Sequence, residues 1–188
     1  MASAPSPPPT RRDAVRNRAR LARAATAAFR EDGLDVAVDA IARRAGVGVA
    51  TLYRHFPTKL ELIVAVTEAV LEDLQTAARV ALDEPDVLRA FLTSAMEQQH
   101  ENRGFLESLT QQALPEDARE DLADRVVAML APIASAAHAA GTLASHLGAE
   151  DLLLAVRMLG ASATTVRPRP PTTSLAVVLG GLAAPADG

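Results

Sequence analysis

Side chains that can hydrogen-bond to a nucleic acid gather in the segment 48–59. Small residues come first, at Gly48-Val49-Ala50-Thr51, and the longer donors Tyr53, Arg54 and His55 follow. Small side chains permit a close approach to base edges, threonine can contact a thymine methyl group, and a guanidinium can bond O6 and N7 of one guanine. The segment therefore predicts a surface that reads double-stranded DNA, with Arg54 as the candidate base reader. A phosphate contact or a merely exposed charge explains Arg54 equally well.

Two short helices joined by a glycine-containing turn are predicted to carry this segment. An apolar stripe with helical spacing precedes the turn, at Val38, Ile41, Ala42 and Ala45. Gly46-Val47-Gly48 forms the turn, and a second helix over residues 49–56 stops before Pro57, because proline disfavours helical geometry in the residue before it. This arrangement is a helix-turn-helix, whose second helix lies in the major groove while the other elements hold the DNA backbone.

Three further residues of the segment have different expected roles. Leu52 and Phe56 are four apart and share one helical face, so we expect them to pack inside the protein. Lys59 stands at the first turn of the next helix, where its charge is unfavourable to the helix dipole. An external anion, such as a DNA phosphate, explains this lysine. The alternative is a solvated lysine.

A longer amphipathic helix is predicted over residues 12–30. Its apolar face consists of Leu21, Ala25, Ala28 and Phe29. The first arginines near its start are expected to reach the DNA backbone or the adjacent minor groove, namely Arg11, Arg12 and Arg16. Solvation of the helix is a sufficient explanation for Arg20 and Arg23.

Start and stop signals set the remaining helix boundaries. Gly33 suits the left-handed conformation that follows a helix. Thr58 and Glu61 have the spacing of a capping box, which predicts the start of a long helix at Lys59. Breaks farther along predict helices near 59–82, 86–101, 105–113, 116–139 and 149–165 and a last apolar segment at 172–182, with a kink at Pro132.

The composition favours an all-α protein. The chain has 188 residues, of which 49% are hydrophobic and only 3% aromatic. Alanine and leucine dominate, and both favour helices. We expect a disordered proline-rich arm at 1–10, a three-helix helix-turn-helix domain at 11–58, and a helical second domain at 59–188.

Charge is distributed unevenly between these parts. Residues 1–59 hold 11 basic and 5 acidic side chains, whereas the remainder holds 8 basic and 18 acidic ones. The net charges are therefore +6 and −10. Such an asymmetry indicates that only the N-terminal part meets a polyanion, although an ordinary solvated basic helix is the alternative.

Several other classes of protein find no support in the sequence. There is no cysteine, and we find no GxSxG motif, phosphate loop, HExxH motif or clustered acid–base pair. We therefore expect no catalytic residues, no cofactor and no metal site, although an enzyme remains a competing hypothesis. No apolar run reaches the roughly 20 residues of a membrane-spanning helix, and residues 1–10 do not read as a secretory signal. We expect a cytoplasmic protein without membrane contact. A protein-binding adaptor is the third hypothesis.

Residues 38–59 resemble the DNA-binding signature of the TetR family of bacterial regulators. The resemblance is carried by Ile41-Ala42, Ala45-Gly46-Val47, Thr51-Leu52-Tyr53, His55-Phe56 and Lys59, and it extends over about 12–70. It implies that Tyr53 and His55 contact phosphates, against a buried aromatic and a structural helix cap as alternatives. One departure is Ala37, where the family often has Ser or Thr to cap the helix and contact phosphate.

The resemblance also implies that the second domain binds a small molecule. Candidate pocket residues are mainly apolar with a few polar groups, as ligand sites tend to be. They are Phe91, Met96, His100, Phe105, Leu109, Gln112, Met129 and Ile133. Ordinary core packing is the alternative for each of them.

Dimerisation through the last two helices is the third implication of the resemblance. The apolar residues expected to pair with a second subunit are Leu152, Leu153, Val156, Leu159, Gly160, Leu175, Val178, Leu179 and Leu182. Closure of the monomer core is the alternative for this set. The function we expect is a homodimeric repressor that binds operator DNA and is released by a small-molecule effector.

Overall fold

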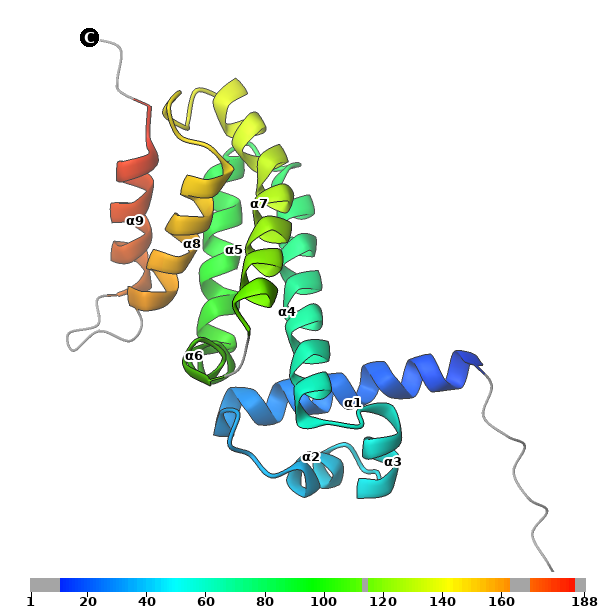
Figure 1. Ribbon diagram of the computed structural model, residues 1–188. Helices are drawn as coiled ribbons and strands as arrows, with labels where there is room; N and C mark the ends of the chain where they lie inside the picture. The colour runs from blue at the N-terminus through cyan, green and yellow to red at the C-terminus, as the bar shows by residue number, and fades with distance from the viewer. Residues whose placement is uncertain (1–10, 113–114, 163–169, 185–188) are drawn as a thin grey trace, which may run out of the picture. The chain divides into compact units, whose positions relative to one another are not determined.

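The computed structural model describes residues 11–112, 115–162 and 170–184, without the side chains of 11–15, 107, 108, 110–112, 162 and 171. In these ranges the chain forms helices and no strand (Figure 1). The helices are α1 Arg11–Asp32, α2 Val38–Arg44, α3 Val49–His55, α4 Lys59–Ala81, α5 Val87–Glu101, α6 Arg103–Gln112, α7 Glu116–Ala139, α8 Ala149–Ser162 and α9 Pro171–Leu182. The expected all-α fold class is confirmed. The arm expected at 1–10 lies outside the described residues.

The chain divides into two compact units, residues 1–69 and 70–188. In the first unit α2 packs on α1, and α3 packs on α2. Its largest fully buried side chains are Leu21, Phe29, Ile41, Leu52, Phe56 and Leu62. Leu52 and Phe56 are 1% and 0% exposed, which confirms that both belong to the core.

Two glycines shape the turns of the first unit. Gly33 and Gly46 have φ angles of 67° and 66°, in the left-handed region that glycine adopts without strain. After α2, the Gly46 N–H donates to the Arg43 carbonyl and the Val47 N–H to the Ala42 carbonyl, both at 3.0 Å. The predicted left-handed Gly33 and the predicted turn between α2 and α3 are therefore confirmed.

Helix α4 begins at Lys59, as the capping signal predicts. The Thr58 hydroxyl accepts a hydrogen bond from the Glu61 N–H at 3.1 Å, which confirms the Thr58 half of the capping box. The boundary between the two units falls inside this helix, after Ala69. It lies later in the chain than the boundary after residue 58 that we expected, so α4 contributes residues to both units.

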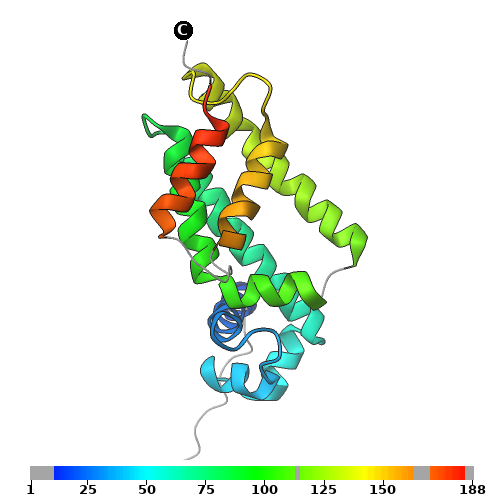
Figure 2. The same cartoon turned by 90° about the vertical axis from the view of Figure 1, so that its left-hand side faces the viewer.

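The second unit is built around α5. Helix α5 contacts α6, α7, α8 and α9, while α7 packs on α8, and α8 on α9. Figures 1 and 2 show α8 and α9 side by side. The Gln99 side chain of α5 donates to the Val156 carbonyl of α8, and a Cβ at Gly160 would overlap with this same side chain. The glycine thus permits the close approach of α5 and α8.

The break between α5 and α6 is shorter than predicted. Helix α6 begins at Arg103 rather than near 105, so Gly104 lies inside it. Asn102 alone separates the two helices, and its side chain donates to the Gln98 carbonyl at 2.8 Å. Its own carbonyl accepts from the Leu106 N–H at 2.9 Å, which starts the next helix immediately.

Most of the residues expected to pair with a second subunit lie in the monomer core instead. Six of them are buried: Leu152, Val156, Leu159, Leu175, Val178 and Leu182. Leu153 and Leu179 are partly buried against the same core. The large apolar side chains that these helices expose are Leu154, Met158 and Val177, which we call the α8–α9 surface. Successive residues of a helix point about 100° apart, so neighbours in the sequence face different sides. Leu152 therefore faces the core while Leu154 faces outward.

Three further observations concern Pro132, membrane-spanning helices and metal-binding groups. Pro132 lies inside α7, which continues through it from Glu116 to Ala139. No helix in the described ranges is both long enough and apolar enough to cross a membrane. Within the same part of the chain, no group of three or more His, Asp or Glu side chains is arranged to hold a metal ion.

Candidate nucleic-acid interface

Helix α3 has one buried face and one exposed face. Leu52 and Phe56 fill the buried side, whereas Val49 and Tyr53 are 39% and 46% exposed. Among the other predicted contacts, Gly48, Ala50 and Arg54 are exposed, while Thr51, His55 and Lys59 are partly exposed. We call Gly48, Val49, Ala50, Thr51, Tyr53, Arg54 and His55 the α3 face. The structure therefore brings these predicted contacts together on one short helix.

Arg54 is the most versatile donor of the α3 face. Its Nη2 donates to the Thr51 hydroxyl, one turn earlier, at 3.3 Å. Among the described residues Arg54 forms no ion pair, so its charge is not neutralised by a carboxylate. A guanidinium so placed can bind either a guanine edge or a phosphate, and the tyrosine hydroxyl of Tyr53 can bind a phosphate beside it.

The N-terminus of α3 is open. Gly48 precedes the helix with φ −72° and ψ 147° and provides no side-chain cap. A Cβ at Gly48 would meet nothing within 4 Å. The backbone at this end is therefore accessible to a partner, as the small residues in the sequence suggest.

Helix α2 also begins without a side-chain cap. Its N-cap is Ala37, with φ −70° and ψ 141°, and no side-chain hydrogen bond is made there. A Ser or Thr at this position would offer a side-chain oxygen to the N–H groups of the first turn. Ala37 has no such oxygen, so the first turn of α2 has no side-chain acceptor.

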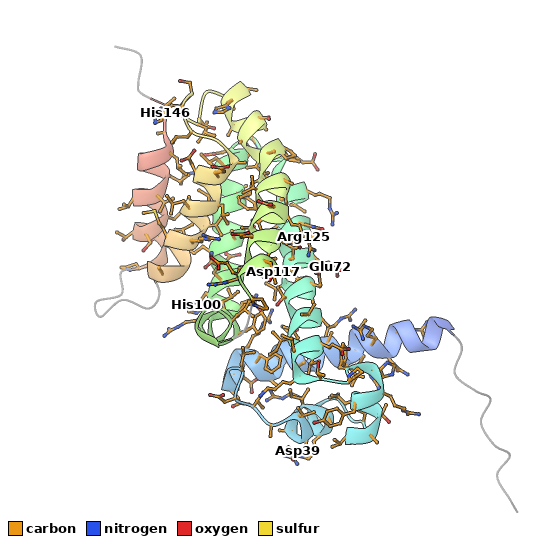
Figure 3. All side chains as sticks on the ribbon, in the orientation of Figure 1. Asp39, Glu72, His100, Asp117, Arg125 and His146 are labelled. Atoms are coloured by element: carbon orange, nitrogen blue, oxygen red, sulfur yellow. The ribbon has the colours of Figure 1, made fainter. Side chains whose placement is uncertain are left out.

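Other basic residues of the first unit fall into two groups. Arg43 binds Asp39 at 2.8 Å, and Arg44 binds Glu31, so acidic partners offset both charges. Figure 3 labels Asp39 on α2. Arg16 is exposed on α1, whereas the side chain of Arg12 lies outside the described residues.

Arg18 is a residue of this unit that our sequence reasoning missed. Its Nη1 donates to the His55 carbonyl at the last residue of α3. Its guanidinium carbon lies 4.3 Å from the centroid of the Phe56 ring. The available signal was its position three residues before the buried Leu21, which puts the exposed Arg18 on the same side of α1.

The candidate ligand residues of the second unit separate into three groups. Phe91, Met96, Met129 and Ile133 belong to one apolar cluster, in which Phe91 and Ile133 are fully buried. Phe105 and Leu109 of α6 are also buried. The side chain of Gln112 lies outside the described residues.

His100 does not join this buried set. It is exposed in the last turn of α5 (Figure 3). The buried face of α5 passes through Leu92, Ala95 and Asn102, and His100 lies off that face. The expectation that His100 helps to wall a pocket is therefore not supported by its position.

Gln98 is a polar group in the second unit that the sequence did not single out. Its Nε2 donates to the Asp73 carbonyl of α4 at 3.2 Å. Its Oε1 is buried and has no hydrogen-bond partner among the described residues. A buried acceptor without a donor carries a cost of about 1–3 kcal/mol, so this oxygen is a candidate contact for a ligand with a donor group.

Comparison with known proteins shows which chains share this arrangement. Residues 21–66 match the family model described as bacterial regulatory proteins, tetR family. The crystal structure of a TetR transcription regulatory protein from Mycobacterium vanbaalenii is 32% identical, with a TM-score of 0.69, over 93% of this chain and 99% of that one. A TetR transcriptional regulator from Streptomyces coelicolor is 30% identical, with a TM-score of 0.63, over 90% of this chain and 99% of that one.

Curated relatives match over a shorter length. The HTH-type transcriptional activator FasR of Mycolicibacterium smegmatis is 36% identical over 94 residues, which are 47% of this chain and 43% of that protein. A regulator from Staphylococcus aureus is 35% identical over 75 residues, or 40% of its length. The chain thus spans about two-fifths of the curated relatives it matches, whereas the likeness to the solved structures covers nearly the whole fold.

Proposed function

The chain belongs to the TetR family of bacterial regulatory proteins, and from this premise we propose that it is a homodimeric transcriptional regulator that binds double-stranded operator DNA through α3. The proposal makes it a cytoplasmic DNA-binding protein and not an enzyme. The observation that carries it is the α3 face, where Tyr53 and Arg54 are exposed on the helix whose Leu52 and Phe56 are buried.

The proposed contacts have distinct roles on the duplex. Gly48 to Thr51 approach the base edges, and Arg54 reads a base or binds a phosphate. Tyr53, His55 and Lys59 bind the phosphate backbone, together with Arg12 and Arg16 from α1. Only the N-terminal part carries a positive net charge, so it is the part that a polyanion attracts.

Selection of duplexes from fragmented genomic DNA by the full-length chain tests this proposal. The affinity of a selected duplex is then measured at several salt concentrations. Because contacts with several phosphates release counterions, affinity should fall steeply as salt rises. Failure to retain any fragment, or an affinity that does not respond to salt, would instead favour the protein-binding adaptor.

A second copy of the chain is the proposed partner of the α8–α9 surface. Leu154 and Met158 lie one turn apart on α8 and are 57% and 52% exposed, and Val177 of α9 is 66% exposed. Gly180 and Gly181 are exposed on α9, and a Cβ at either would meet nothing within 4 Å. Small residues beside apolar ones allow two helices to approach closely. A dimer would present two α3 helices to the half-sites of a pseudo-palindrome.

We propose that a small molecule bound in the second unit releases the protein from its operator. The buried Oε1 of Gln98, which has no hydrogen-bond partner among the described residues, supports an effector that carries a hydrogen-bond donor. Helix α4 belongs to both units, so it offers a physical connection between effector and α3. The effector would act by favouring the dimer state that fits the operator poorly.

The direction of regulation is tested with candidate molecules that carry such a donor. A molecule that raises the melting temperature of the protein binds its folded state. If the protein is a repressor that its effector releases, the same molecule should lower the affinity of the protein for the selected duplex. A molecule that raises this affinity would reverse the proposed response to the effector, and a reporter gene then shows whether DNA binding itself represses or activates, as the name of FasR indicates for that relative.

A further inference from the structure

Arg18 makes two contacts with the end of α3. Its guanidinium donates to the carbonyl of His55, the last residue of that helix. The same group lies over the ring of Phe56, 4.3 Å from the centroid. One planar cation thus binds a backbone acceptor and covers a core aromatic side chain, and both contacts lie within the first compact unit.

The C-terminus of α3 needs such a donor. The last carbonyls of a helix lack partners within the helix. The Phe56 N–H donates to the Leu52 carbonyl at 2.9 Å, but Pro57 has no N–H with which to continue the series. The unpaired carbonyls also form the negative end of the helix dipole, where a cation is favourable. Arg18 supplies both the donor and the positive charge.

The contact of Arg18 with the Phe56 ring connects α1 to the residue that follows α3. Phe56 is fully buried, and a guanidinium over the face of an aromatic ring is attracted by the negative face of the ring. Arg18 is itself exposed, but it lies one turn before the fully buried Leu21, on the same side of α1. The link therefore runs from the packed face of α1 to the last turn of α3.

We propose that Arg18 is a positioning residue, which holds the C-terminal end of α3 against α1 and thereby fixes the angle at which the α3 face meets DNA. This inference rests on the proposed DNA-binding function. The rigidity of α3 matters because base readout depends on donors that stay in place. A seven-residue helix has few hydrogen bonds of its own to hold them.

The competing role for an exposed arginine in this unit is a direct phosphate contact. The two roles differ in their dependence on salt. Removing a phosphate contact reduces the slope of log affinity against log salt by about one unit. Removing a positioning contact lowers affinity by changing the angle of α3, and it should leave the number of phosphate contacts, and hence the slope, nearly unchanged.

The test compares Arg18→Met with Arg20→Met in the full-length chain. Methionine retains an unbranched side chain that can lie over Phe56 but has neither charge nor donor. Arg20 is an exposed arginine on the same helix and provides the matched control. Affinity is measured at several salt concentrations for a duplex that the wild-type chain selected from fragmented genomic DNA.

A second readout requires no DNA. His55-Phe56 is the only His-Phe pair in the chain, so ¹³C-carbonyl histidine combined with ¹⁵N phenylalanine gives a single NMR correlation for this peptide bond. Loss of the Arg18 donor should shift that carbonyl resonance. Arg20→Met should leave it in place.

We expect Arg18→Met to shift the His55 carbonyl resonance. It should also lower the affinity for the selected duplex about tenfold, with an unchanged slope of log affinity against log salt. A reduced slope with an unmoved resonance would show a phosphate contact and overturn the proposal. A shifted resonance with unchanged affinity would overturn the positioning role. If Arg18→Met does not fold, Arg18→Lys replaces it, since lysine keeps the charge and can donate but lacks the planar guanidinium. Arg18→Lys should lose part of the affinity for the selected duplex. A wild-type affinity together with an unmoved His55 carbonyl resonance would refute the proposal.

The outcome also separates this inference from the proposed function. A wild-type chain that selects no duplex would refute DNA binding and, with it, the positioning role. The labelled carbonyl would then still report whether Arg18 caps α3.

Discussion

The α3 face and the α8–α9 surface differ in the chemistry that they offer to a partner. The first presents hydrogen-bond donors at Tyr53 and Arg54 around small residues. The second presents Leu154, Met158 and Val177, which have no strong donor. Binding through the first depends on charge and weakens with salt, whereas binding through the second depends on apolar area removed from water. One chain can therefore hold two partners by independent forces, so each contact should be removable without the other.

The strongest effect is expected from a charge placed on the α8–α9 surface. Val177→Glu would bury an unpaired carboxylate from each subunit, so we expect the dimer to weaken by at least about a hundredfold. Sedimentation at a series of concentrations measures this change. Val80→Glu is the matched control, because Val80 is 59% exposed on α4. Equal effects of the two substitutions would show that the α8–α9 surface is not the dimer contact.

The second substitution removes a donor from the α3 face. Arg54→Ala should lower affinity for a selected duplex about 10- to 100-fold, the range for a lost base contact, while the dimer persists. Arg79→Ala is its control, since Arg79 donates to Thr76 at 3.0 Å much as Arg54 donates to Thr51 at 3.3 Å. Fluorescence anisotropy with a labelled duplex gives both affinities. Identical losses would contradict a specific role for α3.

A third pair of substitutions tests backbone strain in the turn before α3. Gly46→Ala should lower the free energy of unfolding of the first unit by about 1–2 kcal/mol, because Gly46 has φ 66°. Gly48→Ala adds the same methyl group at φ −72° and should cause no such loss. A new Cβ has open space at both positions. Urea unfolding compares the two variants, and equal stabilities would contradict the strain argument.

The weakest effect that we expect is a gain in stability at the start of α2. Ala37→Ser supplies the side-chain acceptor that this N-cap lacks, and should add about 0.5–1 kcal/mol to the free energy of unfolding, measured in urea. Ala37→Val, which has no acceptor, should not. Neither variant should affect the dimer, because Ala37 lies far along the chain from the α8–α9 surface. A serine variant no more stable than the valine variant would contradict the capping argument.

The sequence predicts helix boundaries well where single residues impose them. Pro57 ends α3 by sterics, Gly33 and Gly46 adopt the left-handed conformation, and Thr58 caps α4. The inward side of α3 was also predictable, because Leu52 and Phe56 share one helical face and Tyr53, Arg54 and His55 between them carry polar groups. A helix with one apolar stripe has only one way to face the core.

The orientation of α8 was not predictable in the same way. Leu152, Leu153 and Leu154 are consecutive, and the helix packs the first fully inside while the third is 57% exposed. Apolar residues on every side give no unique inward face, so tertiary packing decides the orientation. Arg18 illustrates a second limit, since it acts through the carbonyl of His55, 37 residues farther along, which only the folded chain brings within reach.

The continuity of α4 through residue 69 constrains how this chain can be recombined with its relatives. Every residue inserted into a helix turns the remainder of that helix by about 100° and advances it by about 1.5 Å. A chimera joined near Ala69 must therefore conserve the number of residues in the helix, or add about seven to complete two turns. A loop at the same place would tolerate length changes that this continuous helix does not, so the first unit can be exchanged only when the junction preserves the helical phase of α4.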